Sequence, residues 1–308
     1  MVPFRRVTHS DPDGTPPNPD VTQPDPDPMR HALAALDLPT HLAQGPEPER
    51  TRLLAEGVLE AAFAHDAARA TALVEERPEG LRRVLVQLCG AAPFFGNHLR
   101  RRPERIFALA EDTGLDQPRL RAEREAALEA CLAAPGDEPV SARLRHFKYD
   151  ELARITQREA DPECIPVDEV QVVLGELSEL AEVLLARALQ HVATELESDV
   201  GPPLWRDAAG TQHRLSFSVL GLGKLGGEEL NYSSDVDLIY VMEAPGGDIT
   251  GLHDGPRDLS PAEYFGRLAT RFGKLVEEVT ADGFLERIDL DLRPEGGQGS
   301  IVSSSQAL

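Results

Sequence analysis

The chain contains 308 residues, of which 41% are hydrophobic, so it is long enough for two domains with sizeable cores. Its 53 acidic residues outnumber 31 basic ones, and the resulting net charge of −22 repels the phosphate backbone of nucleic acids. This charge argues against non-specific binding to DNA or RNA, but it leaves open the binding of a nucleotide carried with Mg²⁺.

The cysteines and the hydropathy pattern indicate the cellular environment. Cys89, Cys131 and Cys164 are widely spaced and form no CxxC pair or Cys/His cluster, which indicates neither a disulfide framework nor a zinc site. We expect each to be a small buried side chain in a reducing compartment. No run of 18 apolar residues and no signal-peptide pattern occurs. We therefore expect a soluble, cytoplasmic protein that does not bind membranes.

The first two thirds of the chain carry a helical pattern after a polar tail. Residues 1–28 are rich in Pro, Asp, Thr and Gly and are expected to be disordered, because they bury too little apolar surface. Residues 29–200 are expected to form a helical domain. Its predicted helical segments are 52–75, 81–88 (ended by Pro93 and Gly96), a segment through 106–109, 120–133, an amphipathic segment 140–158, and 167–196.

From residue 201 the pattern changes to a mixed α/β domain, 201–308. Segments near 215–221, 236–242 and 285–292 are expected to be strands of one small sheet. A helix is predicted to begin at Ser260, because Ser260-Pro261-Ala262-Glu263 is a capping box with proline at the first helical position. Gly283 is placed to cap the end of that helix.

Two carboxylates stand at the start of the second predicted strand. Asp235 and Asp237 are separated by one residue, so in a strand their side chains point to the same side. Two such groups repel unless a cation lies between them, and hard oxygen ligands suit Mg²⁺. The alternative is a solvated turn, but the apolar run 238–241 that follows favours a buried strand.

A third carboxylate, Asp289, lies on the last predicted strand. Arg287, Asp289 and Asp291 form its polar face, and Ile288, Leu290 and Leu292 form its apolar face. Asp289 can join Asp235 and Asp237 if the two strands are neighbours in the sheet. The alternative is that this polar face simply meets solvent.

A glycine-rich loop precedes the Asp-x-Asp pair. The segment 221–227 reads Gly-Leu-Gly-Lys-Leu-Gly-Gly, and such loops let backbone N–H groups approach phosphate closely. Lys224 can add a positive charge, or it can be an ordinary exposed lysine. A metal site beside a phosphate site is typical of nucleotidyl or phosphoryl transfer.

These motifs together resemble a known family. Residues 221–240 closely resemble the bifunctional glutamine-synthetase adenylyltransferase/adenylyl-removing enzymes, which belong to the DNA polymerase beta-like nucleotidyltransferase superfamily. Residues 144–155 with 176–181 look like the helical lead-in of that family, and residues 287–296 look like its third-carboxylate strand. The similarity extends from about residue 80 to residue 308.

The resemblance implies a fold and an activity. The fold class is α + α/β, with a helical domain followed by a polymerase beta-like nucleotidyltransferase sheet and flanking helices. In this family the N-terminal catalytic domain removes AMP from a tyrosine of glutamine synthetase by phosphorolysis, which gives ADP, and the C-terminal one adds AMP from ATP. The form of residues 231–235 is similar to the removing domain. Family members are far longer, so we expect a C-terminally incomplete catalytic domain.

The resemblance also implies site residues and partners. Asp235, Asp237 and Asp289 would be catalytic and would bind Mg²⁺, whereas Asp291 replaces the arginine expected in many members. The residues implied for the nucleotide phosphates are Gly223, Lys224, Gly226, Gly227, Ser233 and Ser234, with turn capping as the favoured role of the two serines. The implied partners are glutamine synthetase, ATP/ADP, phosphate and, through regions outside this chain, the nitrogen-signalling PII protein.

Two alternatives remain open at the level of sequence. The chain can belong to an enzyme that adenylylates glutamine synthetase with ATP, or it can be a non-catalytic regulatory fragment. Release of ADP, as opposed to consumption of ATP, separates removal of AMP from its addition. His146, His191 and His213 have no ligand spacing and are expected to be surface or helix-packing residues.

Overall fold

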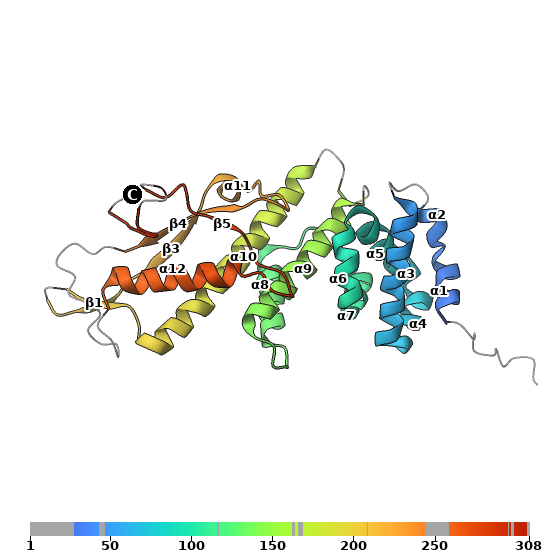
Figure 1. The fold of residues 1–308 in the computed structure, drawn as a ribbon, viewed down its shortest axis with the longest axis horizontal. Helices are drawn as coiled ribbons and strands as arrows, with labels where there is room; N and C mark the ends of the chain where they lie inside the picture. The colour runs from blue at the N-terminus through green and yellow to red at the C-terminus, as the bar shows by residue number, and fades with distance from the viewer. Residues whose placement is uncertain are drawn as a thin grey trace, which may run out of the picture.

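The computed structural model describes residues 28–42, 47–115, 117–161, 164–165, 169–207, 209–243, 259–294, 296 and 299–306. The molecule is elongated, with helices at one end and in the middle. The strands lie at the other end, beside the long helix formed by Pro261–Glu277 (Figure 1). The expected disordered tail, apart from Pro28, lies outside the described residues, as do residues 244–258. Within those residues, no helix has both the length and the apolar character needed to cross a membrane.

The N-terminal helices surround one buried core, which includes Val58, Leu85 and Phe107. Prolines begin several of these helices, at the position where a missing N–H costs nothing. The helices are α1 (Pro28–Leu36), α2 (Leu38–Leu42), α3 (Pro48–His65), α4 (Ala67–Glu76), α5 (Pro78–Ala91), α6 (Pro93–Arg101) and α7 (Glu104–Glu111).

Two details of this region differ from the sequence prediction. The segment 52–75 is broken at Asp66, whose carboxylate accepts the N–H of Arg69 at 3.0 Å and thereby caps α4. Pro93 does end the preceding helical run, but it also starts α6. Gly96 does not break a helix, because it is a buried residue inside α6.

Three longer helices form the middle of the molecule: α8 (Arg121–Ala133), α9 (Val140–Glu159) and α10 (Val170–Val200). The prediction of an amphipathic 140–158 segment is wrong, because α9 buries charged residues as well as apolar ones. Their charges are paired inside the protein. Nε of the fully buried Arg124 lies 3.2 Å from Oε2 of Glu151, and Arg158 pairs with Glu176 of α10. Burial of such charges is tolerated only with partners of this kind.

The sheet is built around β4 (Val236–Met242). β3 (Phe217–Gly221) pairs with it antiparallel, and β5 (Ile288–Asp289) and β6 (Val302–Ser304) pair with it parallel on the other side. The three expected strands therefore lie in one sheet, as predicted, with β4 between β3 and β5. The last one is much shorter than 285–292, and Leu292 is exposed instead of completing an apolar face. β6 and the hairpin of β1 (Leu204–Arg206) and β2 (Gln212–Arg214) were not predicted.

Helix α12 (Pro261–Glu277) packs against the sheet and α10. Its capping box is present as predicted, because the N–H of Glu263 donates to Oγ of Ser260 at 3.2 Å. The expected capping role of Gly283 is wrong. The helix ends at Glu277, and Gly283 lies in a tight turn closed by two backbone hydrogen bonds with Thr280.

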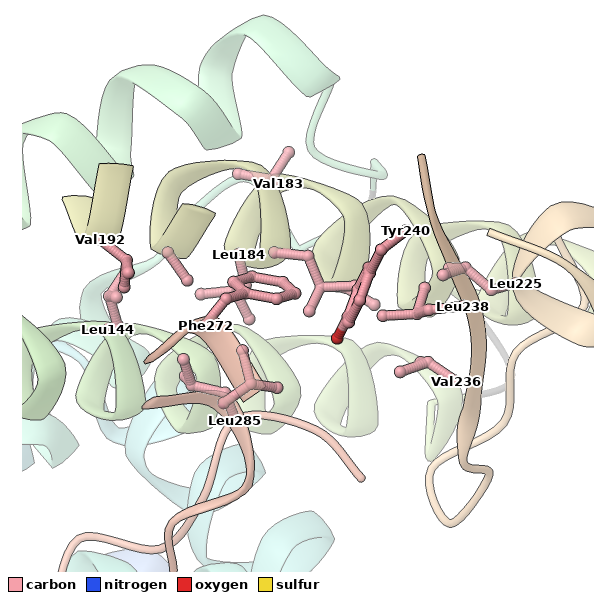
Figure 2. Close-up of a cluster of buried hydrophobic side chains, with 14 of the residues drawn as sticks. Leu144, Val183, Leu184, Val192, Leu225, Val236, Leu238, Tyr240, Phe272 and Leu285 are labelled. Carbon is pink, nitrogen blue, oxygen red and sulfur yellow. The ribbon is translucent and has the colours of Figure 1, made fainter. Parts of the chain in front are cut away.

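A second core joins the sheet to the middle helices. Figure 2 shows Tyr240 of β4 and Phe272 of α12 beside Leu184 of α10, and the two rings are 5.9 Å apart in a T-shaped contact. Helix α9 contributes to both cores, with Leu144 in this one and Tyr149 in the N-terminal one. Secondary structure thus changes near residue 200, as expected, while the middle helices pack with the sheet. The domain boundary at 200 stays a prediction.

The cysteines and histidines expected to have packing roles lie at different depths. Cys89 is buried, as expected, whereas Cys131 and Cys164 are half-buried. His146 is buried in α9 with Nε2 3.0 Å from Oδ1 of Asp282, and His213 stacks on Trp205.

Candidate active site

Two of the predicted carboxylates stand side by side on neighbouring strands. Asp237 of β4 and Asp289 of β5 are register partners in the parallel pair. Paired positions on adjacent strands present their side chains to the same face of a sheet. Both residues are partly buried, and the Asp289 carboxylate is oriented by a 2.7 Å hydrogen bond from the N–H of Asp291.

The glycine-rich loop lies against Asp237. The N–H of Leu222 donates to the carbonyl of Asp237 at 2.9 Å, so the loop is bonded to β4. Gly223 has a φ of +53°, and a Cβ added to it would lie 2.1 Å from Oδ2 of Asp237. Only glycine fits, because both the backbone conformation and the carboxylate exclude a side chain.

The rest of the loop forms the single turn of α11 (Gly223–Gly226) and the residues after it. Gly226 packs so closely on the carbonyl of Gly221 that a Cβ would lie 2.6 Å from that oxygen. Gly227 follows as the C-terminal cap, and its N–H donates to the carbonyl of Gly223 at 3.0 Å. The glycines thus keep this turn compact beside the carboxylates.

The third carboxylate, Asp235, has a different partner. Nε of Arg287 donates to Oδ1 of Asp235, and Nη2 of Arg287 donates to the carbonyl of Ser233. Both side chains of the ion pair are more than half exposed, at 56% and 54%. Arg287 was not among the predicted site residues. The signal that could have indicated it was its place on the polar face of the last strand, two residues before Asp289.

A short hydrogen-bonded chain joins the remaining predicted residues. Nζ of Lys224 donates to Oγ of Ser234 at 3.2 Å, and that hydroxyl donates to Oδ1 of Asn231 at 2.9 Å. The same Asn231 oxygen accepts the N–H of Ser233 at 3.1 Å. The acceptor that closes the turn is therefore the Asn231 side chain, and the expected capping role falls to it.

Basic residues of α9 fix the segment that leads to β5. Nζ of Lys148 lies 3.0 Å from Oε1 of Glu286 and also donates to the carbonyl of Leu285. Nη2 of Arg145 donates to the carbonyls of Leu275 and Glu278 at 3.2 and 3.1 Å. Burial raises the pKa of Glu286, and the Lys148 ammonium opposes that shift. The helical region thus positions the strand that carries Asp289.

A cavity of about 660 Å³ lies between α9, the α5–α6 junction and the Asn231–Ser233 turn. Phe94, Tyr149, Phe284 and Tyr232 are among the residues that line it. The hydroxyl of Tyr232 donates to Oε2 of Glu159 at 2.9 Å. Tyr232 thus connects the Asn231–Ser233 turn to the C-terminal end of α9.

The donor set of the three aspartates suits a hard cation, although only two of them stand together. Oxygen ligands of this kind are those that Mg²⁺ prefers. Asp237 and Asp289 are register partners, but Asp235 is held by Arg287. Across the described parts of the chain, no three His, Cys, Asp or Glu side chains are arranged to hold a metal ion. The Mg²⁺ site therefore stays a prediction.

Comparison with known proteins establishes the family. The family model described as glutamate-ammonia ligase adenylyltransferase matches residues 82–308, which run from α5 through β6. The chain belongs to this family. The resemblance expected from the sequence motifs is thus confirmed, and it covers the middle helices as well as the sheet.

Several curated relatives are named bifunctional glutamine synthetase adenylyltransferase/adenylyl-removing enzyme. The one from Thioalkalivibrio sulfidiphilus is 38% identical over 225 residues, covering 73% of this chain and 22% of that protein. The one from Xanthomonas campestris is 37% identical over 227 residues, covering 74% and 22%. The one from Burkholderia pseudomallei is 38% identical over 205 residues, covering 65% and 20%. This member of the glutamate-ammonia ligase adenylyltransferase family therefore spans about one fifth of the length of these relatives.

Proposed function

We propose that this chain forms the N-terminal part of a Mg²⁺-dependent nucleotidyltransferase that removes AMP from the adenylylated tyrosine of glutamine synthetase. Its family and the names of its relatives support the substrate and the class of chemistry. The observation that carries the proposal is the β4–β5 register, which sets Asp237 beside Asp289 with Gly223 against the Asp237 carboxylate.

Each residue of the site has a role in this reaction. Asp235, Asp237 and Asp289 would hold Mg²⁺, which supplies neutralisation of charge on the phosphoryl oxygens. The loop 223–227, with Lys224, would face the phosphate groups. Inorganic phosphate attacks the AMP phosphorus in line, the bond to the tyrosine oxygen breaks, and that oxygen takes a proton from solvent. The products are ADP and unmodified tyrosine, and no protein nucleophile is needed.

ATP-dependent adenylylation, a separate reaction that attaches AMP and releases pyrophosphate, is the main competing activity. The removing direction is favoured by the Asn-Tyr-Ser-Ser-Asp form of residues 231–235, which follows a long helical region. Under this proposal the partners are adenylylated glutamine synthetase, phosphate and ADP, and the PII protein would act through regions outside this chain.

The test compares both directions with matched substrates. The chain is incubated with adenylylated glutamine synthetase, phosphate and MgCl₂, and release of ADP is measured. A parallel reaction contains unmodified glutamine synthetase and ATP, and incorporation of AMP is measured. Phosphate-dependent ADP release that Asp237→Asn abolishes would support the proposal. AMP incorporation without ADP release would favour the adenylylating alternative.

A full-length relative serves as the reference for rate. We expect the chain to be much slower than the full-length protein, because small displacements of reacting groups can cost on the order of 100-fold in rate. Equal rates would refute the expectation of an incomplete catalytic domain. Binding to glutamine synthetase without turnover in either direction, under conditions in which the full-length relative is active, would favour a regulatory fragment.

A further inference from the structure

Arg287 combines a fixed backbone with an exposed side chain. Its carbonyl accepts the N–H of Val236 at 2.9 Å, which bonds its backbone to β4 directly before β5 begins. Its guanidinium group contacts Asp235 and the carbonyl of Ser233, and more than half of the side chain is exposed to solvent. The backbone thus keeps Arg287 beside the carboxylates, while exposure lets the guanidinium group change partners.

Three other basic side chains near the site are less available than Arg287 and the exposed Lys224. Lys148 and Arg145 are buried, and they donate to the backbone carbonyls of Leu285 and of Leu275 at the end of α12, respectively. Nη1 of Arg293, which is partly buried, donates to the carbonyl of Leu290 at 2.7 Å. Arg287 has an ion pair with Asp235 and a hydrogen bond to the carbonyl of Ser233, both at the surface, and exposed ion pairs are weak and screened by salt.

We propose that Arg287 is a phosphate-binding residue that exchanges Asp235 for a phosphate group of the nucleotide when a divalent cation binds Asp235. The proposal rests on the proposed function, from which it takes the cation and the nucleotide. A divalent cation and the guanidinium group compete for the same carboxylate, and the doubly charged ion gains more from the neighbouring carboxylates of Asp237 and Asp289. The released guanidinium group has the planar, two-pronged geometry that matches a phosphate.

The proposal predicts opposite effects on two ligands. Because Arg287 competes for Asp235, Arg287→Gln should bind Mn²⁺, used as a spectroscopic substitute for Mg²⁺, roughly 5-fold more tightly. Because Arg287 contacts phosphate, the same variant should bind ADP in excess MgCl₂ roughly 10-fold more weakly. Mn²⁺ binding is measured by electron paramagnetic resonance, and ADP binding by calorimetry.

Two further variants separate this role from others. Arg287→Lys keeps the charge but loses the planar fork, so Mn²⁺ affinity should stay near that of the unmodified chain while ADP binding weakens. Arg271→Gln removes an exposed arginine that pairs with Asp199 at 2.7 Å, away from the carboxylates, and should change neither affinity. Thermal melting shows whether each variant is folded.

The possible results distinguish failure of the proposed role of Arg287 from failure of the metal site itself. If Arg287 only braces the turn at Ser233, then Arg287→Gln will weaken Mn²⁺ binding, and this result would overturn the proposal. Unchanged Mn²⁺ affinity or unchanged ADP affinity would overturn it as well. If the unmodified chain binds no Mn²⁺, the metal site of the proposed function is itself refuted, which is a different result from a metal site that does not respond to Arg287.

Discussion

The ammonium group of Lys148 in α9 lies 3.0 Å from Oε1 of Glu286, and both side chains are about nine-tenths buried. This buried ion pair connects the middle helices to the segment that leads into β5. Its environment contrasts with that of the Arg287–Asp235 pair, which is mostly exposed. The two pairs are therefore expected to differ in their contribution to stability.

Replacement of Lys148 by Met should destabilise the protein by about 3 kcal/mol at pH 7, because it leaves the Glu286 carboxylate buried without its partner. The loss should be smaller at pH 4. Burial raises the pKa of Glu286, and its protonated form needs no cation. Urea unfolding at the two pH values measures both effects.

The control is an exposed pair. Arg214 of β2 pairs with Glu197, and Arg214→Gln should cost less than about 1 kcal/mol. The double variant Lys148→Met with Glu286→Leu should recover most of the stability, because a buried ion pair can often be replaced by apolar groups. If Lys148→Met costs no more than Arg214→Gln, the buried pair does not hold this segment in place.

Asp150 should make the stability depend on pH. Burial raises its pKa to about 6, although Nη1 of Arg105 lies 2.9 Å from Oδ2. The folded state therefore binds its proton more tightly than the unfolded state does. The stabilisation that the protonated group provides is complete below about pH 4 and is lost as the pH rises through about 6.

Relative to Asp150→Asn, the unmodified protein should thus lose up to about 3 kcal/mol between pH 4 and pH 7. The quantity to compare is the change in the free energy of unfolding with pH. Asp150→Asn also alters the contact with Arg105, but that effect is the same at every pH. Asp199→Asn, at the exposed pair with Arg271, is the matched control and should show no such slope. Parallel stability profiles for the unmodified protein and Asp150→Asn would contradict the prediction.

Gly223→Ala should destabilise the protein by roughly 1–3 kcal/mol, because the added methyl group meets the Asp237 carboxylate and the backbone has a positive φ. It should also weaken Mn²⁺ binding by displacing Asp237. The control is Gly266→Ala in α12, where a Cβ meets no atom within 4 Å and φ is helical. That variant should stabilise the protein by about 0.5–1 kcal/mol. Similar melting temperatures for the two variants would argue against a close approach of Gly223 and Asp237.

Asp289 and Asp291 should respond differently to the same change. Asp289→Asn should weaken Mn²⁺ binding at least about 10-fold and abolish metal-dependent turnover in a full-length protein, because a charged oxygen ligand is lost. Asp291→Asn should leave both unchanged, since its side chain is exposed and its backbone N–H makes the contact to Asp289. A strong loss of Mn²⁺ binding in Asp291→Asn would show that Asp291 is a ligand.

Local signals in the sequence were sufficient for several features. The capping box at Ser260, the Asp-x-Asp pair at the start of an apolar strand and the change from helix to strand near residue 200 all depend on residues a few positions apart. The pairing of Asp289 with Asp237 could also be inferred, because an acidic residue on a neighbouring strand was the natural partner for the pair.

Other features depend on contacts between segments that are distant in the sequence, and no local sequence pattern indicates such contacts. Gly283 has a glycine's conformation, yet the helix before it ends at Glu277 and the glycine forms a separate turn. The charged residues of α9 look solvent-exposed in the sequence, but partners on α8, α10 and the segment before β5 allow them to be buried.

The expectation of cation and phosphate chemistry at the candidate site rests on residue types and spacing, whereas the arrangement of the site depends on the fold. Three aspartates and a glycine-rich loop indicate cation and phosphate binding from their composition alone. The pairing of Arg287 with Asp235 depends on two segments 52 residues apart meeting at the edge of the sheet. An electrostatic contact of this kind is determined by position in space, and only the tertiary structure supplies that position.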